Sequence, residues 1–196
     1  MHSETHLEQT LEVIGNQFYQ AWLYFYAAKH LEQADLMGCL RYLYSAVYWA
    51  CIDDAILVFS RLLLKNPDSV TLHNLLYIAE NQSTLFKFAT PEIIKESVAN
   101  SRVQLEGFTP LFEVIKTQRD KMLAHLDKKH VNDLDDILAI PLINFYEVEN
   151  CLHETLKIFN VYKGFYDQSK LYLGDVEDNL REDVEYLSSL IAGANQ

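Results

Sequence analysis

Several sequence features that particular classes of protein require, such as glycine-rich loops, paired cysteines and an excess of basic residues, are missing from this chain. Its six glycines are scattered singly, so it has no glycine-rich loop of the kind that cradles the phosphates of a nucleotide. Its three cysteines lack CxxC spacing, and we interpret them as buried thiols in a reducing compartment. Lys and Arg number 16 against 28 Asp and Glu, and the net charge of −12 argues against binding duplex DNA through a broad basic surface.

Long, uninterrupted hydrophobic runs are also missing. The most apolar stretch, residues 47–64, is broken by polar or charged residues at positions 53, 54, 60 and 61, which predicts a buried helix and not a membrane span. Residues 1–9 are polar and have no hydrophobic signal core. These absences predict a cytoplasmic protein that does not enter a membrane.

Helical periodicity, in contrast, extends over most of the sequence. Apolar residues recur every three or four positions between about Leu7 and Glu32, as in a helix with one buried face. Period-two alternation, the pattern of a half-buried strand, is rare, so no strand is expected. The predicted stripe consists of Leu11, Ile14, Phe18, Trp22 and Phe25, and it is widened by Tyr19, Leu23 and Tyr26.

Capping residues and prolines set the expected limits of the other helices. Thr90-Pro91-Glu92 combines a cap, a first-turn proline and a first-turn acid, and Thr109-Pro110 repeats the signal. Gly164 and Gly174 are expected to bracket a short connecting segment. The predicted helices are 36–64, 70–81 with Ser69 as cap, 91–107, one opening at Thr109, a short one capped by Asp133 and Asp136 and ending at Pro141, 142–162, and one from Asp175 to about 191.

These elements predict an all-α fold, an antiparallel bundle of six to eight helices. A chain of 196 residues buries enough surface to fold without a disulfide or a structural metal. We expect one domain over residues 1–196, with residues 175–196 as an appended acidic C-terminal helix. From Asp175 to Glu185 six acids stand against one arginine; this stretch is interpreted as a solvated helix face, or as a surface that shields the basic segment or docks a basic partner.

Residues with chemical potential concentrate between positions 116 and 130. The sequence from Arg119 is RDKMLAHLDKKH, which places an arginine and His125 six residues apart. Cleavage of RNA without a metal requires one group that holds phosphate charge and one that moves protons. Arginine suits the first role through its planar fork of donors, and histidine suits the second because it titrates near neutrality. Five Lys and Arg between Lys116 and His130 stand against two Asp, a local basic excess in an acidic chain.

The spacing of Arg119 and His125 resembles the Arg-(four to six residues)-His signature of the HEPN superfamily, an all-helical group rich in ribonucleases. The wider string RDKMLAHLD is similar to the pattern of the AbiU-like abortive-infection branch. That pattern includes Asp120 and Lys121 after the arginine, an alanine before the histidine and Asp127 two residues after it. The resemblance implies a HEPN-like helical domain in bacterial antiphage defence or a toxin–antitoxin pair.

The resemblance also implies a reaction. The enzyme would be an endoribonuclease that needs no metal or other cofactor, in which the 2′-OH of RNA attacks the adjacent phosphorus and DNA is spared. Arg119 and His125 are the expected catalytic residues, Lys121 is expected to assist phosphate binding, and Asp120 and Asp127 are expected to orient the catalytic pair. The implied partners are RNA, a second subunit that completes the cleft at a homodimer seam, and an antitoxin or regulatory protein.

Several alternatives stay open from the sequence. A HEPN-like module that binds nucleotide, RNA or a protein without cutting is the first, and a plain helical interaction subunit with a coincidental motif is the second. Met122 and Leu126 are either anchors of the homodimer seam or ordinary core residues. Asp53 and Asp54 are interpreted as a structural polar network with Arg41, Arg61 or another buried donor, or as residues that line the active cleft.

A metal site is not expected. His125, Asp127 and His130 have spacings of two and three, which suit a loop better than a helix, and no Cys or Glu completes the set. Glu149 and His153 are four residues apart on one helix face, whereas the ferritin-like bundle motif has Glu-x-x-His and repeats it.

Overall fold

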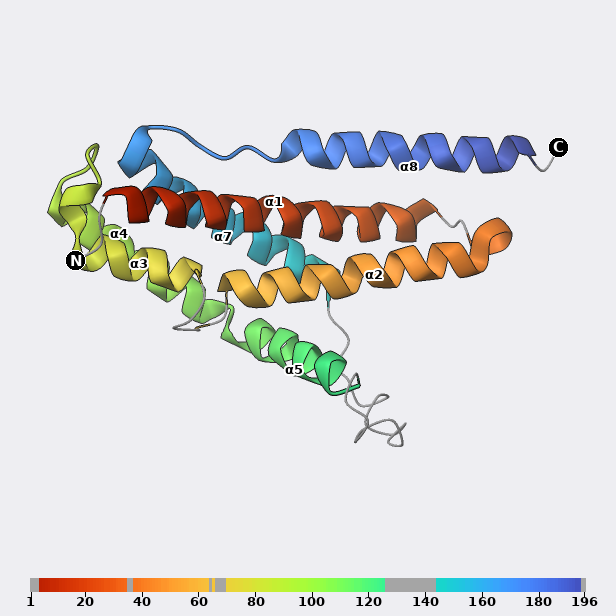
Figure 1. Ribbon diagram of the computed structural model, residues 1–196, viewed down its shortest axis with the longest axis horizontal. Helices are drawn as coiled ribbons and strands as arrows, with labels where there is room; N and C mark the ends of the chain where they lie inside the picture. Colours follow the sequence, from red (N-terminus) through yellow and green to blue (C-terminus); the bar gives the residue numbers. More distant parts are fainter. Residues whose placement is uncertain (1–3, 35–36, 64, 66–69, 126–143, 195–196) are drawn as a thin grey trace. The chain divides into compact units, whose positions relative to one another are not determined.

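The structure is a computed structural model that describes residues 4–34, 37–63, 65, 70–125 and 144–194, with the backbone alone at 37–41, 121–125 and 192–194. Every regular element in this described part is a helix (Figure 1). Seven of them are α-helices, which confirms the predicted all-α fold. The short helix expected to end at Pro141 lies outside the described residues. The elements are α1 (Glu4–Ala34), α2 (Met37–Leu63), α3 (Leu72–Asn81), the 3₁₀ turn η1 (Ser83–Leu85), α4 (Pro91–Gly107), α5 (Thr109–His125), α7 (Phe145–Asp167) and α8 (Gly174–Ala194).

The start of α4 follows the predicted capping signal. The side-chain oxygen of Thr90 accepts a hydrogen bond from the backbone N–H of Ile93, and Pro91 occupies the first helical position. Thr90→Ala is therefore expected to lower the free energy of unfolding by about 1 kcal/mol, because that N–H loses its acceptor. Thr109→Ala is the matched control, and urea denaturation should show a change below about 0.5 kcal/mol there. Equal losses in the two variants would contradict the capping role.

Two other predicted helix starts are wrong by one or a few residues. The cap of α3 is Thr71, whose side-chain oxygen accepts from the N–H of Asn74 at 3.2 Å, and not Ser69, which itself lies outside the described residues. Thr109 is the first residue of α5 and not its cap, since a backbone hydrogen bond of the first turn ends on the carbonyl of Phe108. Both differences are within the one or two residues by which the ends of a helix are usually uncertain from local signals.

α7 begins and ends later than the sequence predicts, and Gly164 lies inside it. A glycine in a helix interior costs about 1 kcal/mol relative to alanine, so a helix end was expected there. Contacts beyond the glycine outweigh this cost. The ring of Phe165 lies 6.0 Å from the ring of Tyr162, and the carbonyl of Phe165 accepts a hydrogen bond from the N–H of Phe88 at 2.9 Å.

The chain divides into two compact units. Unit 1 comprises residues 1–18 and 59–171, and unit 2 comprises residues 19–58 and 172–196. The division falls inside α1 and α2, so each of these helices contributes to both units. The expectation of one domain with residues 175–196 as an appended helix stays a prediction.

The core of unit 1 is built from aromatic pairs and one buried polar pair. The ring of Phe18 in α1 lies 5.4 Å from that of Phe159 in α7, and the ring of Phe86 lies 6.3 Å from that of Tyr162. The Tyr162 hydroxyl is hydrogen-bonded to the Ser101 hydroxyl of α4 at 2.9 Å, in a buried position. Burial raises the pKa of Tyr162 to about 12. These contacts join α1, α4 and α7.

Unit 2 has its own small core between α1, α2 and α8. Leu31 and Tyr44 are buried, and Val184 and Ile191 of α8 pack against them. The Tyr44 hydroxyl donates a hydrogen bond to the Leu31 carbonyl at 2.7 Å. That carbonyl belongs to the last turn of α1, where backbone acceptors have no partner within the helix. Tyr44 therefore completes the end of the preceding helix.

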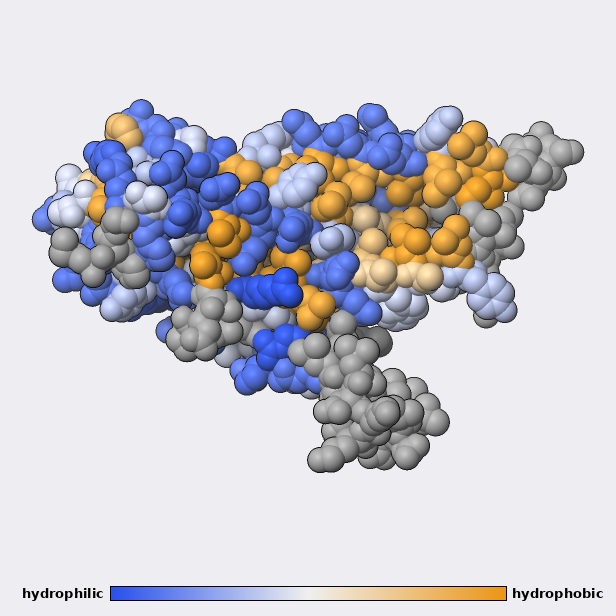
Figure 2. All heavy atoms as spheres, in the orientation of Figure 1, coloured by the Kyte–Doolittle hydropathy of each residue, from blue (hydrophilic) through white to orange (hydrophobic). Residues whose placement is uncertain are grey.

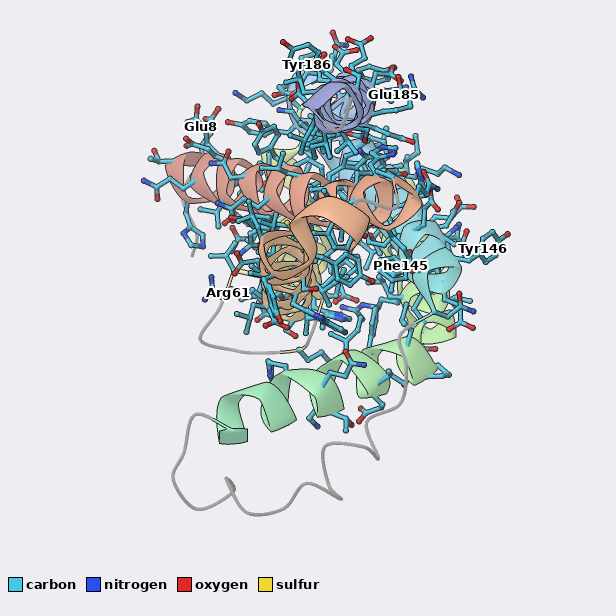
Figure 3. The ribbon with its side chains drawn as sticks, turned by 90° about the vertical axis from the view of Figure 1, so that its right-hand side faces the viewer. Glu8, Arg61, Phe145, Tyr146, Glu185 and Tyr186 are labelled. Carbon is cyan, nitrogen blue, oxygen red and sulfur yellow. The ribbon has the colours of Figure 1, made fainter. Side chains whose placement is uncertain are left out.

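The predicted apolar stripe of α1 is largely confirmed. All five of its expected core residues are buried, and Tyr26 is buried with them. The prediction that Tyr19 widens the buried stripe is wrong, because 46% of this residue is exposed. Leu23 is half-buried. In α8 the acidic residues follow the interpretation as a solvated face, and Glu185 and Tyr186 point away from the helix (Figure 3).

The apolar stretch of α2 is more exposed than predicted. Trp49 is 58% exposed, and Asp53 and Asp54 lie on the surface, so the predicted buried polar network is wrong. Partial burial and the neighbouring Asp54 raise the pKa of Asp53. Cys151 is a buried thiol as expected, with its pKa raised to about 12 by burial, whereas Cys51 is only half-buried. None of the described helices has the length and hydrophobicity that crossing a membrane requires.

Candidate functional site

α5 carries the arginine–histidine motif and packs against α4 within unit 1. Its buried side consists of Leu111, Phe112 and Ile115. Residues three and four apart share a face of a helix, so this side continues toward Arg119. The Arg119 side chain is 29% exposed. It therefore lies where the buried side of α5 meets solvent.

Asp120 holds the guanidinium of Arg119. A single carboxylate oxygen, Oδ1, accepts from Nε at 2.8 Å and from Nη2 at 2.6 Å. The structure thus brings together two of the predicted site residues, and the contact agrees with the expectation that Asp120 orients Arg119. A guanidinium has five N–H donors, and the contact with Asp120 uses two of them.

The Arg119–Asp120 pair is weak enough to be rearranged by a ligand. The two side chains are 29% and 53% exposed, and ion pairs in such surroundings contribute only about 0–1 kcal/mol. A phosphate that approaches Arg119 offers anionic oxygens in a matching two-pronged geometry, so it can compete with the carboxylate for the guanidinium. The pair therefore pre-orients the arginine without blocking it.

The other predicted site residues are placed only in part. The backbone of α5 is helical through Lys121 and His125, and their side chains are outside the described part. Asp127 lies outside the described residues altogether. A helix rises 1.5 Å and turns about 100° per residue, so Arg119 and His125 stand about 9 Å apart along α5 and about 120° apart around it. One continuous helix therefore does not present both residues on one face.

Lys116 is a further candidate that the motif itself does not include. It precedes Arg119 by three residues, so the two positions are neighbours on the surface of α5. Lys116 is exposed, and it forms no ion pair with another described residue. The helical spacing from Arg119 is the signal that identifies it. The two residues therefore place two cations one turn apart on α5, with the Asp120 carboxylate paired to the second of them.

The described residues give no indication of a metal site. No three His, Cys, Asp or Glu side chains gather there as a ligand set. This statement does not extend to Asp127 and His130, which lie outside the described residues, or to the side chain of His125. Glu149 and His153 lie on α7, and no third ligand of these types joins them among the described side chains.

Comparison with known proteins identifies a family over nearly the whole chain. The family model described as AbiU2, a HEPN family, matches residues 4–187. The match includes every described helix except the end of α8, and it includes the complete segment from Arg119 to Asp127. No curated protein and no solved structure matches the chain.

Proposed function

The chain belongs to the AbiU2 family of HEPN proteins, and we propose that it is a metal-independent endoribonuclease of a bacterial defence or toxin–antitoxin system. The observation that carries this proposal is the arrangement at Arg119: a partly exposed guanidinium that Asp120 orients through two of its five N–H donors. RNA is the proposed substrate. A second copy of the chain and an antitoxin or other regulatory protein are the proposed partners, and the cytoplasm is the proposed location.

Arg119 is the proposed phosphate-binding residue. In the transition state of RNA transesterification, negative charge builds on the non-bridging oxygens of the phosphate, and a pre-oriented guanidinium stabilises that charge more than it stabilises the substrate. Lys116 supports binding of the same or the neighbouring phosphate from one turn earlier on α5, and Lys121 is proposed to assist from the other side. Asp127 is proposed to orient His125.

His125 is the proposed proton-transfer residue. It removes the proton from the 2′-OH, the 2′ oxygen forms a bond to phosphorus, and the bond from phosphorus to the 5′ oxygen breaks. The departing 5′ oxygen takes up a proton, for which the second subunit's copy of this histidine is the proposed donor. The products are a 2′,3′-cyclic phosphate and a free 5′-OH. General acid–base catalysis of this kind contributes about 10²–10⁴-fold to the rate.

The geometry of α5 favours a cleft made from two copies. Arg119 and His125 occupy positions on one helix that are separated by about 9 Å along the axis and about 120° around it. At reaction the attacking oxygen and the phosphorus are about 3 Å apart. An arginine and a histidine must therefore both reach the same phosphate group at the same time. Two antiparallel copies of α5 bring the arginine of one copy toward the histidine of the other. A homodimer therefore supplies what a single helix lacks.

The test uses full-length protein and two substrates in excess EDTA. One is a short RNA, and the other carries a single 2′-deoxy nucleotide at the site that is cut. We expect wild-type protein to cut the first and leave the second intact, because only the first has the attacking 2′-OH. The products should carry 2′,3′-cyclic phosphate and 5′-OH ends, as read by mass spectrometry. Cleavage of the deoxy substrate at the same position would contradict the mechanism.

A binding module without cleavage is the second candidate, and the net charge of −12 is the observation that favours it. An acidic protein binds phosphate strongly only through small basic areas of its surface. Because few phosphates are then contacted, the affinity for RNA depends only weakly on salt concentration. Binding of the intact RNA without any product, with Arg119→Ala abolishing the binding, would establish this candidate in place of the nuclease.

A further inference from the structure

Two cations and an imidazole lie close together where the end of α2 meets α3 and α4, within unit 1. Lys65 follows the end of α2, His73 lies in the first turn of α3, and Arg102 lies in α4. We call these three residues the α3 cluster. None of them belongs to the arginine–histidine motif of α5. Figure 2 shows mostly hydrophilic residues at the surface over α3.

His73 stands in a positive electrostatic field. Its ring donates a hydrogen bond to the backbone carbonyl of Leu63, in the last turn of α2. Burial lowers the pKa of His73, and the charges of Lys65 and Arg102 lower it further against the effect of that hydrogen bond. A charge shifts a pKa in this way when it lies near the group, so both cations lie near the imidazole. Such a local field is unusual in a chain with a net charge of −12, and an anion would relieve it.

Arg102 is held along α3 by one carboxylate. Its Nη2 donates to Oε2 of Glu80, and the two side chains are 45% and 41% exposed. His73, Tyr77 and Glu80 are separated by four and three residues, so they share one side of α3. Arg102 pairs with the last of these residues and acts on the first, so its guanidinium lies along the same side. An ion pair this exposed is weak, and a phosphate can compete with Glu80 for the arginine.

Tyr77 adds an aromatic surface to this side of α3. It follows His73 by one helical turn and is 57% exposed. Proteins that bind single-stranded nucleic acid combine cations that follow the backbone with exposed aromatic rings on which bases stack. The α3 cluster and Tyr77 supply both parts on one surface.

We propose that the α3 cluster binds a backbone phosphate of single-stranded RNA, and that Tyr77 stacks on a base beside that phosphate. Lys65 and Arg102 supply the positive charge, and the hydrogen bond to Leu63 fixes the ring of His73 beside them. The inference rests on the proposed function in taking RNA as the ligand. It adds a binding contact outside the cleft at Arg119.

The α3 cluster lies within reach of an RNA that occupies this cleft. α4 ends at Gly107 and α5 begins at Thr109, so the Cα atoms of Arg102 and Arg119 are at most about 30 Å apart. Stacked nucleotides of one strand are spaced by about 3.4 Å, so about nine of them cover this distance. An RNA of about 12 nucleotides is therefore long enough to contact both places.

The test measures the affinity of full-length protein for such an RNA by fluorescence anisotropy at several salt concentrations. Every 2′-OH of the RNA is methylated, so the RNA cannot be cleaved by the proposed reaction. Lys65→Gln/Arg102→Gln should bind on the order of 10–100-fold more weakly, and the salt slope should fall by about 0.7 for each lost phosphate contact. Lys157→Gln/Arg181→Gln is the matched control, because it removes the same charge from exposed, ion-paired cations outside the cluster. Equal affinities for the two double variants would overturn the proposal.

Glu80→Gln separates phosphate binding from a structural role of Arg102. It removes the carboxylate that competes for the guanidinium, so RNA should bind at least as tightly as to wild type. If Arg102 acts only by holding α3 on α4, Glu80→Gln should weaken binding as much as Arg102→Gln does, and that result would overturn the proposal. Tyr77→Ala should weaken binding on the order of 10-fold. Tyr146→Ala is its control, because Tyr146 is 77% exposed on α7, and equal affinities for these two variants would overturn the stacking contact.

Inorganic phosphate is the probe for the other source of this chemistry, a free phosphate group. Calorimetry should show binding only in the millimolar range or weaker. Tight binding of phosphate that Lys65→Gln/Arg102→Gln abolishes, with the affinity for RNA unchanged, would overturn the assignment to RNA. Cleavage assays test the proposed function separately. If RNA is cleaved and this double variant binds and cuts like wild type, the present inference alone fails. If the methylated RNA binds through the α3 cluster but no RNA is cleaved, the nuclease alone fails.

Discussion

Arg119→Ala is expected to slow RNA cleavage by about 10²–10³-fold, the usual loss when one pre-oriented donor to transition-state charge is removed. Arg119→Lys keeps the positive charge but loses the planar fork that Asp120 orients at 2.6 and 2.8 Å, so most of the loss should persist. His125→Ala should slow cleavage by about 10²–10⁴-fold, because it removes the proposed proton-transfer group. Single-turnover cleavage rates of a defined RNA in EDTA measure all three variants.

The double variant Arg119→Ala/His125→Ala should be hardly slower than the worse of the two single variants. In the proposed mechanism the two residues act on the same phosphate in the same step, so their effects should not be additive. Multiplicative losses would indicate that they act independently, and would count against a shared cleft.

A control with similar electrostatics is available in unit 2. Arg181 of α8 pairs with Asp178 at 2.7 Å, with side chains 50% and 59% exposed, so it resembles the Arg119–Asp120 pair without belonging to the motif. Arg181→Ala should leave cleavage unchanged. All variants should keep the helical circular-dichroism spectrum and the melting temperature of wild type, because Arg119 lies at the edge of the buried side of α5 and not inside it. Unfolding of Arg119→Ala would remove the basis for assigning it to chemistry.

Phe159→Ala is expected to lower the free energy of unfolding by about 3–5 kcal/mol, the range for truncating a buried phenylalanine. Only 1% of Phe159 is exposed, and its ring lies 5.4 Å from that of Phe18. It also lies close to the backbone of α1, since a methyl group built on Gly15 would meet the ring at 3.8 Å. A cavity here would therefore loosen the contact between α1 and α7.

Phe88→Ala is the matched control for Phe159→Ala. Phe88 is 51% exposed, and its contact with α7 is made by its backbone N–H, which alanine retains. The expected loss is below about 1 kcal/mol. Urea denaturation followed by circular dichroism gives both values. Similar losses for the two variants would show that the α1–α7 contact does not stabilise unit 1 as described.

Much of the fold follows from local signals in the sequence. The cap and proline at Thr90 and Pro91 start α4 as predicted, because capping depends only on neighbouring backbone groups. The errors arise where distant contacts decide. Gly164 favours a helix end locally, but the ring and carbonyl of Phe165 keep α7 intact beyond it. In α2 the apolar composition predicts burial, and the structure exposes one whole face.

The candidate site is predictable to a smaller extent. The motif locates Arg119 and Asp120 on one helix, and neighbours in sequence are sufficient to bring their side chains together. The relation of Arg119 to His125 is different, because a helix places residues six apart on different sides. In the proposed mechanism the two meet through a second copy of α5, and no periodicity within one chain encodes the position of such a copy.

The hydroxyl of Tyr44 has a consequence for motion at the end of α1. Helix ends usually fray on their own, since their last carbonyls lack partners and opening them costs little. Here the Leu31 carbonyl is held by a buried tyrosine of the next helix, in the small core that α8 also covers. Opening the last turn of α1 therefore requires Tyr44 to leave that core. The last turn of α1 should therefore open cooperatively with this core, and its amide hydrogens should exchange slowly.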